Sequence, residues 1–286
     1  MDLYSKYKKL LFTLAYQLTG SVADAEDAVQ DVFVKYYSLD SEGIEEPKAY
    51  LCKMVTNQCL DLLKSARKRR EQYFGSWLPE PVLSSDYGED LINSVLQNEL
   101  LSYGMLVLLE RLSPAERVVF VLREALSCEY SDISRLVSKS EVSCRKLMSR
   151  SRAKMGIAEE KPVMSTYEGD YWIKQFVKAL ENGNIEEILS LLAEDVTLVS
   201  DGGGKVSAAA KPIISRDYVT KFLLGLMRQI PQYKEGIQIE LTPLNGQTGI
   251  IVRSGNVINT AILIHVDFDV IKYLYFVRNP EKLTHL

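Results

Sequence analysis

A glycine-rich loop and a few acidic and histidine side chains are the residues of this 286-residue sequence that could carry out chemistry. The loop Asp201-Gly202-Gly203-Gly204-Lys205 offers backbone N–H groups and a lysine, which together can cradle an anion. His265, Asp267 and Asp269, with Asp201, have the side chains of acid/base catalysis. An anion site and a catalytic site are therefore the two chemical hypotheses.

The sequence context favours structural roles for both groups. The loop lacks the GxxxxGK[ST] pattern of a nucleotide-binding loop, and its glycines permit positive φ and the close approach of another segment. His265 lies in the apolar run AILIHVDF, and Asp267 and Asp269 flank a predicted turn. We therefore predict that the protein is not an enzyme and uses no cofactor.

Metal binding and membrane insertion are not predicted either. The four cysteines, all within residues 52–144, form no CxxC pair and lie far from both histidines in the sequence, so neither a zinc site nor a disulfide framework is indicated. No apolar run approaches the ~18 residues of a membrane span, and the N-terminal sequence has no small-residue cleavage site. We expect a cytoplasmic protein without membrane contact.

The charge of the chain is segregated along its length. The composition, 47% hydrophobic and 25% charged with a net charge of −4, is that of a globular protein. Residues 76–110 contain acidic residues but no Lys or Arg, whereas basic residues gather in 64–70 and 139–154. Such clusters indicate contacts with nucleic-acid phosphates, but cations also stabilise helix C-termini. Charge alone leaves both explanations open.

Helical periodicity dominates the first 155 residues. Apolar spacing predicts helices at 6–18 and 24–36 and a third after Pro47 that runs into the first basic cluster. From Gly75 the periodicity stops in a proline-containing, acidic linker, where Trp77 is unusual and should dock on another part of the protein.

A second helical region follows the linker. Ser113-Pro114-Ala115-Glu116 combines three helix-start signals, and the helices predicted at 130–137 and 141–154 have the spacing of a helix-turn-helix. We expect inward-facing Val142, Cys144 and Leu147 or Met148. The outward-facing, groove-reading residues would then be Ser143, Arg145, Lys146, Ser149 and Arg150.

The last part of the chain mixes helices and strands. Two helices, a strand at 196–199 and a helix from Ser215 precede β-type runs at 237–242, 248–253, 257–266 and 270–277. Helices followed by a curled antiparallel sheet predict an α+β domain.

Taken together, DAEDAVQDVF (24–33), AYLCKMVTNQCLDLLKSARKRR (49–70) and the segment 112–155 resemble extracytoplasmic-function (ECF) sigma factors. Asn57 and Asp61 match the family's N-x-x-x-D pattern, whereas Lys64 stands where relatives commonly have Arg, which keeps the charge but loses the planar fork. The resemblance implies two all-α domains, sigma region 2 and the sigma region 4 helix-turn-helix, in a promoter-specificity subunit of bacterial RNA polymerase.

The resemblance also implies which residues bind which partner. On core RNA polymerase the contacts would be Asp24, Asp27, Gln30 and Asp31, although a solvated helix face explains the same string when it is taken alone. Melted minus-10 promoter DNA would meet Asn57, Asp61, Lys64 and Arg67, and the minus-35 element would meet the outward-facing residues of the second helix of the helix-turn-helix.

Three further motifs resemble group 41 of these sigma factors, which carry a SnoaL-like C-terminal extension. They are Trp77-Leu78-Pro79-Glu80-Pro81, the loop 201–205, and Asn279-Pro280-Glu281-Lys282-Leu283. The resemblance implies a conical barrel similar to nuclear transport factors and polyketide cyclases, which regulates activity in place of a separate anti-sigma protein. An unidentified small molecule in the barrel's pocket is a further partner that it allows.

These observations predict a multidomain chain. Its parts are a region 2 domain at 1–74, a linker at 75–104, a region 4 domain at 105–158 and a SnoaL-like domain at 165–286. The alternative is a helix-turn-helix regulator joined to a small-molecule-binding or enzymatic domain, which would have no need of the motif at 24–33. If the chain is a sigma factor, we expect the loop 201–205 to act on the other domains by contact with the linker motif 77–81.

Overall fold

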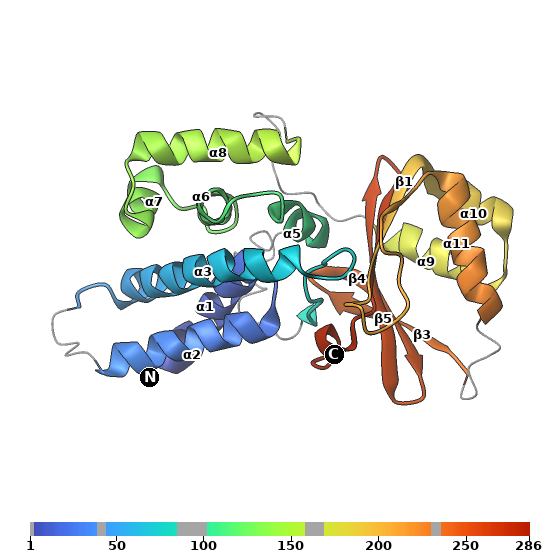
Figure 1. Ribbon diagram of the computed structural model, residues 1–286, viewed down its shortest axis with the longest axis horizontal. Helices are drawn as coiled ribbons and strands as arrows, with labels where there is room; N and C mark the ends of the chain where they lie inside the picture. The colour runs from blue at the N-terminus through green and yellow to red at the C-terminus, as the bar shows by residue number, and fades with distance from the viewer. Residues whose placement is uncertain (1–2, 39–43, 85–101, 158–168, 230–235) are drawn as a thin grey trace. The chain divides into compact units, whose positions relative to one another are not determined.

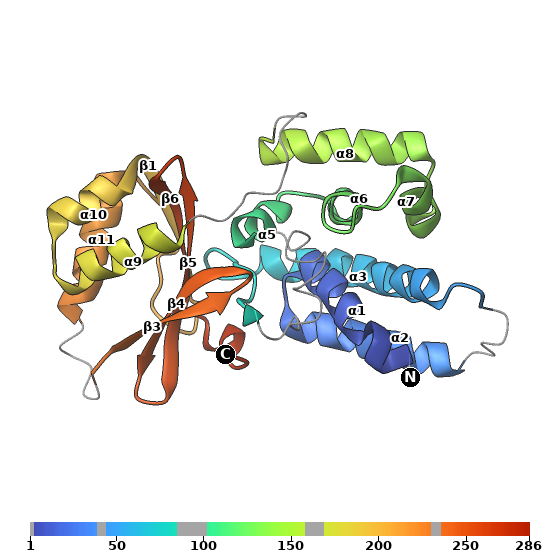
Figure 2. The same ribbon diagram turned by 180° about the vertical axis from the view of Figure 1, so that it is seen from behind.

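The computed structural model describes residues 3–38, 44–84, 102–157, 169–229 and 236–286 (Figures 1 and 2). The chain forms two compact units. The helical unit comprises Met1–Glu71 and Tyr87–Ser165, and the α+β unit comprises Gln72–Asp86 and Thr166–Leu286. The first part of the predicted linker therefore belongs to the same compact unit as the C-terminal part of the chain.

Three N-terminal helices form one half of the helical unit: α1 (Leu3–Thr19), α2 (Val22–Ser38) and α3 (Pro47–Glu71). All three pack against one another, as the predicted apolar stripes require. The α2 stripe is buried along its length, and the Ser21 hydroxyl accepts a hydrogen bond from the backbone N–H of Asp24 (3.2 Å) near the start of the helix.

Four shorter helices form the other half: α5 (Tyr103–Leu109), α6 (Pro114–Glu124), α7 (Tyr130–Val137) and α8 (Glu141–Met155). The predicted capping box at Ser113 and Glu116 is present, and Ser138 in the left-handed conformation ends α7 before α8. Cys144 and Met148 face inward as expected, but Val142 is 62% exposed, which corrects the prediction for that residue. Val142 is the second residue of α8, in a first turn where Glu141 and Ser143 are exposed as well.

Helix α6 joins the two halves of the helical unit. It packs against α7 and α8 and also against α1 and α3. As a result all seven residues from Glu116 to Leu122 are buried, although a helix packed on one side only would bury a single stripe. The two helical halves thus share one apolar core.

The α+β unit contains helices α9 (Asp170–Glu181), α10 (Ile185–Leu191) and α11 (Arg216–Gln229) beside a six-stranded sheet. The strands are β1 (Leu192–Asp201), β2 (Ile213–Ile214), β3 (Gln238–Leu244), β4 (Gln247–Ser254), β5 (Val257–Asp267) and β6 (Val270–Val277), and a 3-10 turn, η5 (Pro280–Lys282), follows. Their order in the sheet is β2-β1-β6-β5-β4-β3.

The sheet is mixed rather than wholly antiparallel. Strand β1 pairs with β6 in parallel, whereas the other neighbouring pairs are antiparallel. A parallel pair needs a long crossover connection, and α11 with the β3–β5 meander supplies it. The expectation of an antiparallel sheet is therefore wrong for this pair.

One face of the sheet and the three helices enclose the core of the unit, with Phe176, Leu198 and Leu274 among the buried residues. The linker also pairs with the sheet strands. Leu83 forms a β-bridge with Leu244, and Val82 exchanges hydrogen bonds with Asn245, whose backbone N–H donates to the Val82 carbonyl (2.9 Å). Leu78 and Val82 are consequently buried.

Candidate polymerase, promoter and linker-binding residues

The acidic residues of α2 form a solvent-facing surface opposite its buried stripe. Asp27, Gln30 and Asp31 are exposed, and Asp24 is half-buried. The Asp31 carboxylate accepts a hydrogen bond from the side-chain amide of Gln58 on α3 (2.9 Å), which holds it in place. This surface presents negative charge and amide groups on a rigid helix.

The polar face of α3 is also accessible. Asn57 and Asp61 are exposed, and Lys64 Nζ lies 2.8 Å from Asp61 Oδ1 in an ion pair whose side chains are 66% and 77% exposed. Such surface pairs contribute little to stability, so Lys64 can exchange Asp61 for a phosphate at small cost. The side chain of Arg67 lies outside the described residues.

The outward residues of α8 stand on a firmly anchored helix. Arg145 and Lys146 are exposed, as are Ser143, Ser149 and Arg150. Further along α8, Arg152 pairs with Glu124 (2.6 Å) and Lys154 with Glu116 (2.7 Å), both on α6. The second basic cluster therefore divides into cations that point to solvent and cations that fix α8 to α6.

Glu116 is the centre of that anchor. Its Oε2 accepts hydrogen bonds from the backbone N–H of Ser113 (2.8 Å), from the Ser113 hydroxyl (2.7 Å) and from Lys154 Nζ. Burial alone would raise the pKa of Glu116, but the hydrogen bonds from Lys154 and Ser113 outweigh it, and the pKa is lowered. Glu116 therefore acts as a carboxylate that both caps α6 and holds α8.

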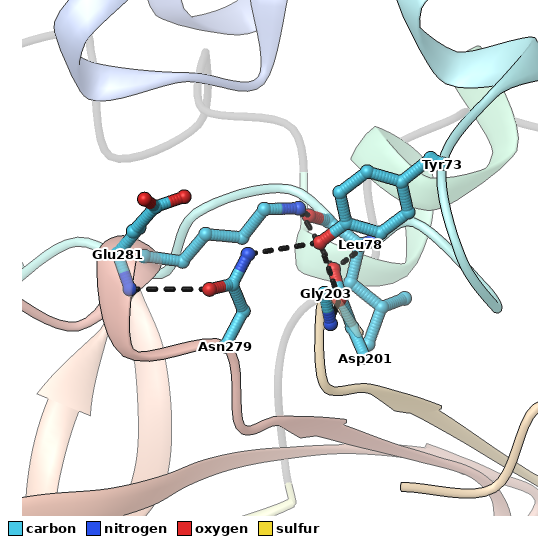
Figure 3. Close-up of polar contacts among 7 residues, drawn as sticks. Tyr73, Leu78, Asp201, Gly203, Asn279 and Glu281 are labelled. Atoms are coloured by element: carbon cyan, nitrogen blue, oxygen red, sulfur yellow. Dashed lines mark hydrogen bonds and ion pairs between the residues drawn. The ribbon is translucent and has the colours of Figure 1, made fainter. Parts of the chain in front are cut away.

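The Asp201 carboxylate connects three sequence motifs within the α+β unit (Figure 3). Asp201 is completely buried. Its Oδ1 accepts hydrogen bonds from the Tyr73 hydroxyl (2.7 Å) and the Gly203 N–H (3.0 Å). Its Oδ2 accepts them from the Leu78 N–H (2.9 Å) and Lys282 Nζ (2.7 Å). Four donors thus satisfy a carboxylate that would otherwise be costly to bury.

Lys282 completes this network from the C-terminal side. Its Nζ also donates to the Leu78 carbonyl (2.5 Å) and lies over the rings of Trp77 (4.1 Å to the centroid) and Tyr73 (5.1 Å). A cation over an aromatic ring is attracted by the ring quadrupole. This contact accounts for the tryptophan in the linker.

Asn279 and the glycines of the loop 201–205 fit closely together. The Asn279 side-chain amide donates to the Tyr73 hydroxyl (2.9 Å). Gly203 and Gly204 have φ of +61° and +70°, and a Cβ on Gly203 would lie 2.4 Å from Asn279 Nδ2. Lys205 pairs with Glu281. The loop's lysine and the Gly203 N–H are therefore engaged within the protein, which removes the basis of the anion-site hypothesis.

Tyr73 and His285 join the linker contacts although the sequence motifs do not include them. Burial and the hydrogen bond to the Asp201 carboxylate raise the pKa of Tyr73. His285 Nε2 donates to the carbonyl of Pro81 (2.6 Å). Tyr73 lies just beyond a basic helix end and His285 is next to the last residue, and neither position carries a pattern that would distinguish it from an ordinary surface residue.

The four candidate catalytic residues are not assembled into a catalytic group. Asp267 and Asp269 are exposed at the β5–β6 hairpin, before β6 begins at Val270, whereas Asp201 pairs in register with Val277 at the far end of that strand. His265 packs beside Tyr273, and burial lowers its pKa. Asp201 therefore lies about 20 Å along the sheet from the hairpin acids, too far for shared proton transfer.

Two further findings concern metals and membranes. Among the described residues, His, Cys, Asp and Glu side chains form no group of three or more that could hold a metal ion, and the four cysteines are free thiols. In the same part of the chain, every helix is too short or too polar to cross a bilayer.

Comparison with known proteins assigns the two helical halves. Residues 3–69 match the family model described as Sigma-70 region 2, and residues 105–155 match Sigma-70, region 4. The chain is 33% identical over 250 residues to the ECF RNA polymerase sigma factor SigJ of Mycobacterium tuberculosis. This alignment covers 86% of this chain and 78% of the relative. The chain is an ECF sigma factor.

Structural similarity extends over the whole of this sigma factor. The crystal structure of M. tuberculosis SigJ matches with a TM-score of 0.80 and 29% identity, and the match covers 99% of this chain and 98% of the other. The probable ECF sigma factor SigI of M. tuberculosis is 29% identical over 65% of this chain and 64% of its own length. Sigma factors bind core RNA polymerase and promoter DNA in transcription initiation, and the region 2 match excludes a simple helix-turn-helix regulator.

Proposed function

We propose that this sigma factor directs RNA polymerase to its promoters and that its own C-terminal part regulates it, in place of a separate anti-sigma protein. The observation that carries the regulatory proposal is the Asp201 network, which binds the linker between regions 2 and 4 into the α+β unit. The motifs at 77–81, 201–205 and 279–283, together with three helices that pack against a six-stranded sheet, support the assignment of this unit to the SnoaL-like class.

In this proposal the exposed acidic surface of α2 binds core polymerase. Asp24, Asp27, Gln30 and Asp31 would contact basic and polar groups on the clamp of core polymerase. Charge reversal of Asp27 and Asp31 should weaken capture of core enzyme, whereas the Glu26→Lys variant, on the same helix, should not. If the unaltered protein fails to bind core polymerase at moderate salt, this function is excluded for the chain.

Promoter binding requires the two helical halves to separate. The minus-10 and minus-35 elements are about 25 base pairs apart, which is about 85 Å of duplex. A compact unit of some 150 residues has a radius of gyration of only about 15 Å. With α6 packed against α1 and α3, region 2 and region 4 cannot reach both elements at once. The compact helical unit is therefore an inactive arrangement.

The linker must change its surroundings when the helical unit opens. Its residues 77–82 run between α3 of region 2 and α5 of region 4, and they are held by Asp201, Lys282 and Asn245. While Leu78 and Val82 are buried in the α+β unit, this segment is not available for contact with polymerase. Regulation would be a shift between a linker-bound and a linker-free state.

The test is run-off transcription with core polymerase and variants of the full chain. Lys282→Met should shift the equilibrium toward the linker-free state and change transcription from the cognate promoter. Lys272→Met, which removes a surface ion pair with Asp195 in the same unit, is the matched control and should leave it unchanged. Truncation through 201–205 should differ in effect from truncation at 279, because each removes different linker contacts. Equal activity of all variants would refute regulation by the linker.

A further inference from the structure

Tyr130, the first residue of α7, is a meeting point of three helices. The guanidinium of Arg123, at the end of α6, lies over its ring at 5.1 Å from the centroid. The guanidinium of Arg145, on α8, lies over the same ring at 4.3 Å. One aromatic ring is thus in contact with a cation from the helix before it and a cation from the helix after it.

The two arginines differ in how firmly they are held. Arg123 Nη1 donates to the carbonyl of Cys128 (2.9 Å) and to Glu129 Oε1 (3.1 Å), so the loop before α7 fixes it. Arg145, by contrast, lies over the Tyr130 ring and 3.3 Å from the carboxylate of Glu141 on its own helix, and its side chain is 59% exposed. The loop before α7 therefore fixes Arg123 against the Tyr130 ring, whereas Arg145 contacts the same ring and stays accessible to solvent.

We propose that Tyr130 is a positioning residue that sets the direction in which Arg145 meets a base of the minus-35 element. This inference rests on the proposed role of Arg145 in promoter binding. Arginine discriminates guanine by a bidentate contact, which requires a defined orientation of the guanidinium plane. A long side chain that is free in solution must lose rotamer freedom to adopt that orientation, and stacking on a fixed ring reduces that loss.

The proposal separates two effects of Arg145. Its charge attracts phosphates of any sequence, whereas its orientation distinguishes one base from another. Removing the ring leaves the charge in place but frees the side chain. We therefore expect loss of base discrimination with little loss of general DNA affinity.

A purely structural role for Tyr130 predicts a different outcome. Ile133 is the completely buried residue of α7, whereas Tyr130 is only half-buried. If Tyr130 merely packs α7, its removal would lower stability and weaken transcription from all promoters alike. Tyr130→Phe keeps the ring and its attraction for cations, so it should behave as the unaltered protein does in either case, whereas Tyr130→Leu separates the two cases.

The experiment uses the full chain with core polymerase on promoters that carry each of the four bases at every minus-35 position. The variants are Tyr130→Leu, Tyr130→Phe, Arg145→Ala and the Tyr130→Leu/Arg145→Ala double variant. Tyr218→Leu, which removes a tyrosine beside Lys221 on α11, is the matched control. The readout is the ratio of transcription between preferred and disfavoured bases, with the unfolding midpoint measured in parallel.

Tyr130→Leu should lower this ratio about two- to fivefold, the factor that corresponds to one exposed cation–π contact, and only at positions that Arg145→Ala also relaxes. Tyr130→Phe should retain the ratio, and the double variant should show no loss beyond that of Arg145→Ala. An unchanged ratio in Tyr130→Leu, or an equal decrease on all promoters, would overturn the positioning role. If Arg145→Ala itself relaxes no position, the proposed promoter contact fails, and the role of Tyr130 fails with it.

Discussion

Lys282 Nζ lies 2.7 Å from Asp201 Oδ2 in an ion pair whose side chains are 7% and 0% exposed. Lys282 also donates to a linker carbonyl, and Asp201 accepts from a linker N–H and a linker-proximal hydroxyl. The pair therefore does more than join β1 to η5, because each of the two charged groups also forms a hydrogen bond with the linker backbone at Leu78. Release of the linker would leave both charges with fewer partners, so the buried pair and the bound linker stabilise each other.

Breaking this pair from one side should destabilise the α+β unit strongly. For Lys282→Met or Asp201→Asn we expect a loss of about 3–5 kcal/mol, because each leaves an uncompensated buried charge or its unpaired hydrogen-bonding partners. Both tryptophans, Trp77 and Trp172, belong to this unit, so urea unfolding followed by tryptophan fluorescence reports on it selectively. Lys272→Met, at the exposed pair with Asp195, should leave the midpoint nearly unchanged.

The glycines of the loop 201–205 provide an independent test of the close packing. Gly203→Ala would place a Cβ 2.4 Å from Asn279 Nδ2 in a residue with φ of +61°, so it combines a steric clash with backbone strain. We expect a lower fluorescence-detected midpoint than in the unaltered chain. Gly225→Ala in α11, where a Cβ meets nothing within 4 Å, should raise stability by up to about 1 kcal/mol. Equal effects of the two substitutions would contradict the packing.

Acidification should weaken the attachment of α8 to α6 through Glu116. Because the pKa of Glu116 is lowered in the folded protein, its contribution is present above the ordinary glutamate pKa of about 4.5 and is lost as the pH falls through the folded value. Urea unfolding of the helices, followed by circular dichroism at several pH values, should show this loss. In Glu116→Gln the acid-dependent part should be smaller and stability at pH 7 lower, because the charge facing Lys154 is gone.

The sequence predicts the helices well because their signals are local. The capping box at Ser113 and Glu116 and the break between the helices predicted at 130–137 and 141–154 depend only on neighbouring residues, and the structure confirms both. The prediction for Val142 is wrong because it follows from the hydrophobicity of the residue and not from its position in the exposed first turn of α8. The parallel pairing of β1 with β6 depends on residues about 75 positions apart, for which strand patterns carry no information.

The contacts of the linker likewise join residues that are far apart in the sequence, and sequence patterns do not reveal such pairs. Trp77 could be predicted to dock somewhere, since a free linker rarely exposes tryptophan, but the sequence does not show that Lys282 lies over its ring. Tyr73 was missed because a single tyrosine after a basic helix has no distinguishing pattern, although it donates to Asp201. The resemblance of the motifs indicates which segments contact one another, whereas only the folded structure shows which atoms form the contacts.

Thiol reactivity should report the opening of the helical unit. Burial raises the pKa of Cys52 from 9.0 to about 11 and the pKa of Cys59 to about 12. A rise of two units lowers the thiolate fraction at neutral pH about a hundredfold, so Cys52 should react slowly with a maleimide in the free protein.

Separation of region 4 from region 2 would remove α6 and α7 from α3 and return Cys52 to solvent. On addition of core polymerase and promoter DNA we therefore expect faster labelling of Cys52, identified by mass spectrometry, with Cys52→Ser as the site control. Asp27→Lys/Asp31→Lys, whose binding to core enzyme should be weakened, should be labelled more slowly than the unaltered chain under the same conditions. Labelling of Cys52 that stays slow in a complex competent for transcription would show that regions 2 and 4 remain packed on the promoter, and the opening step would then be wrong.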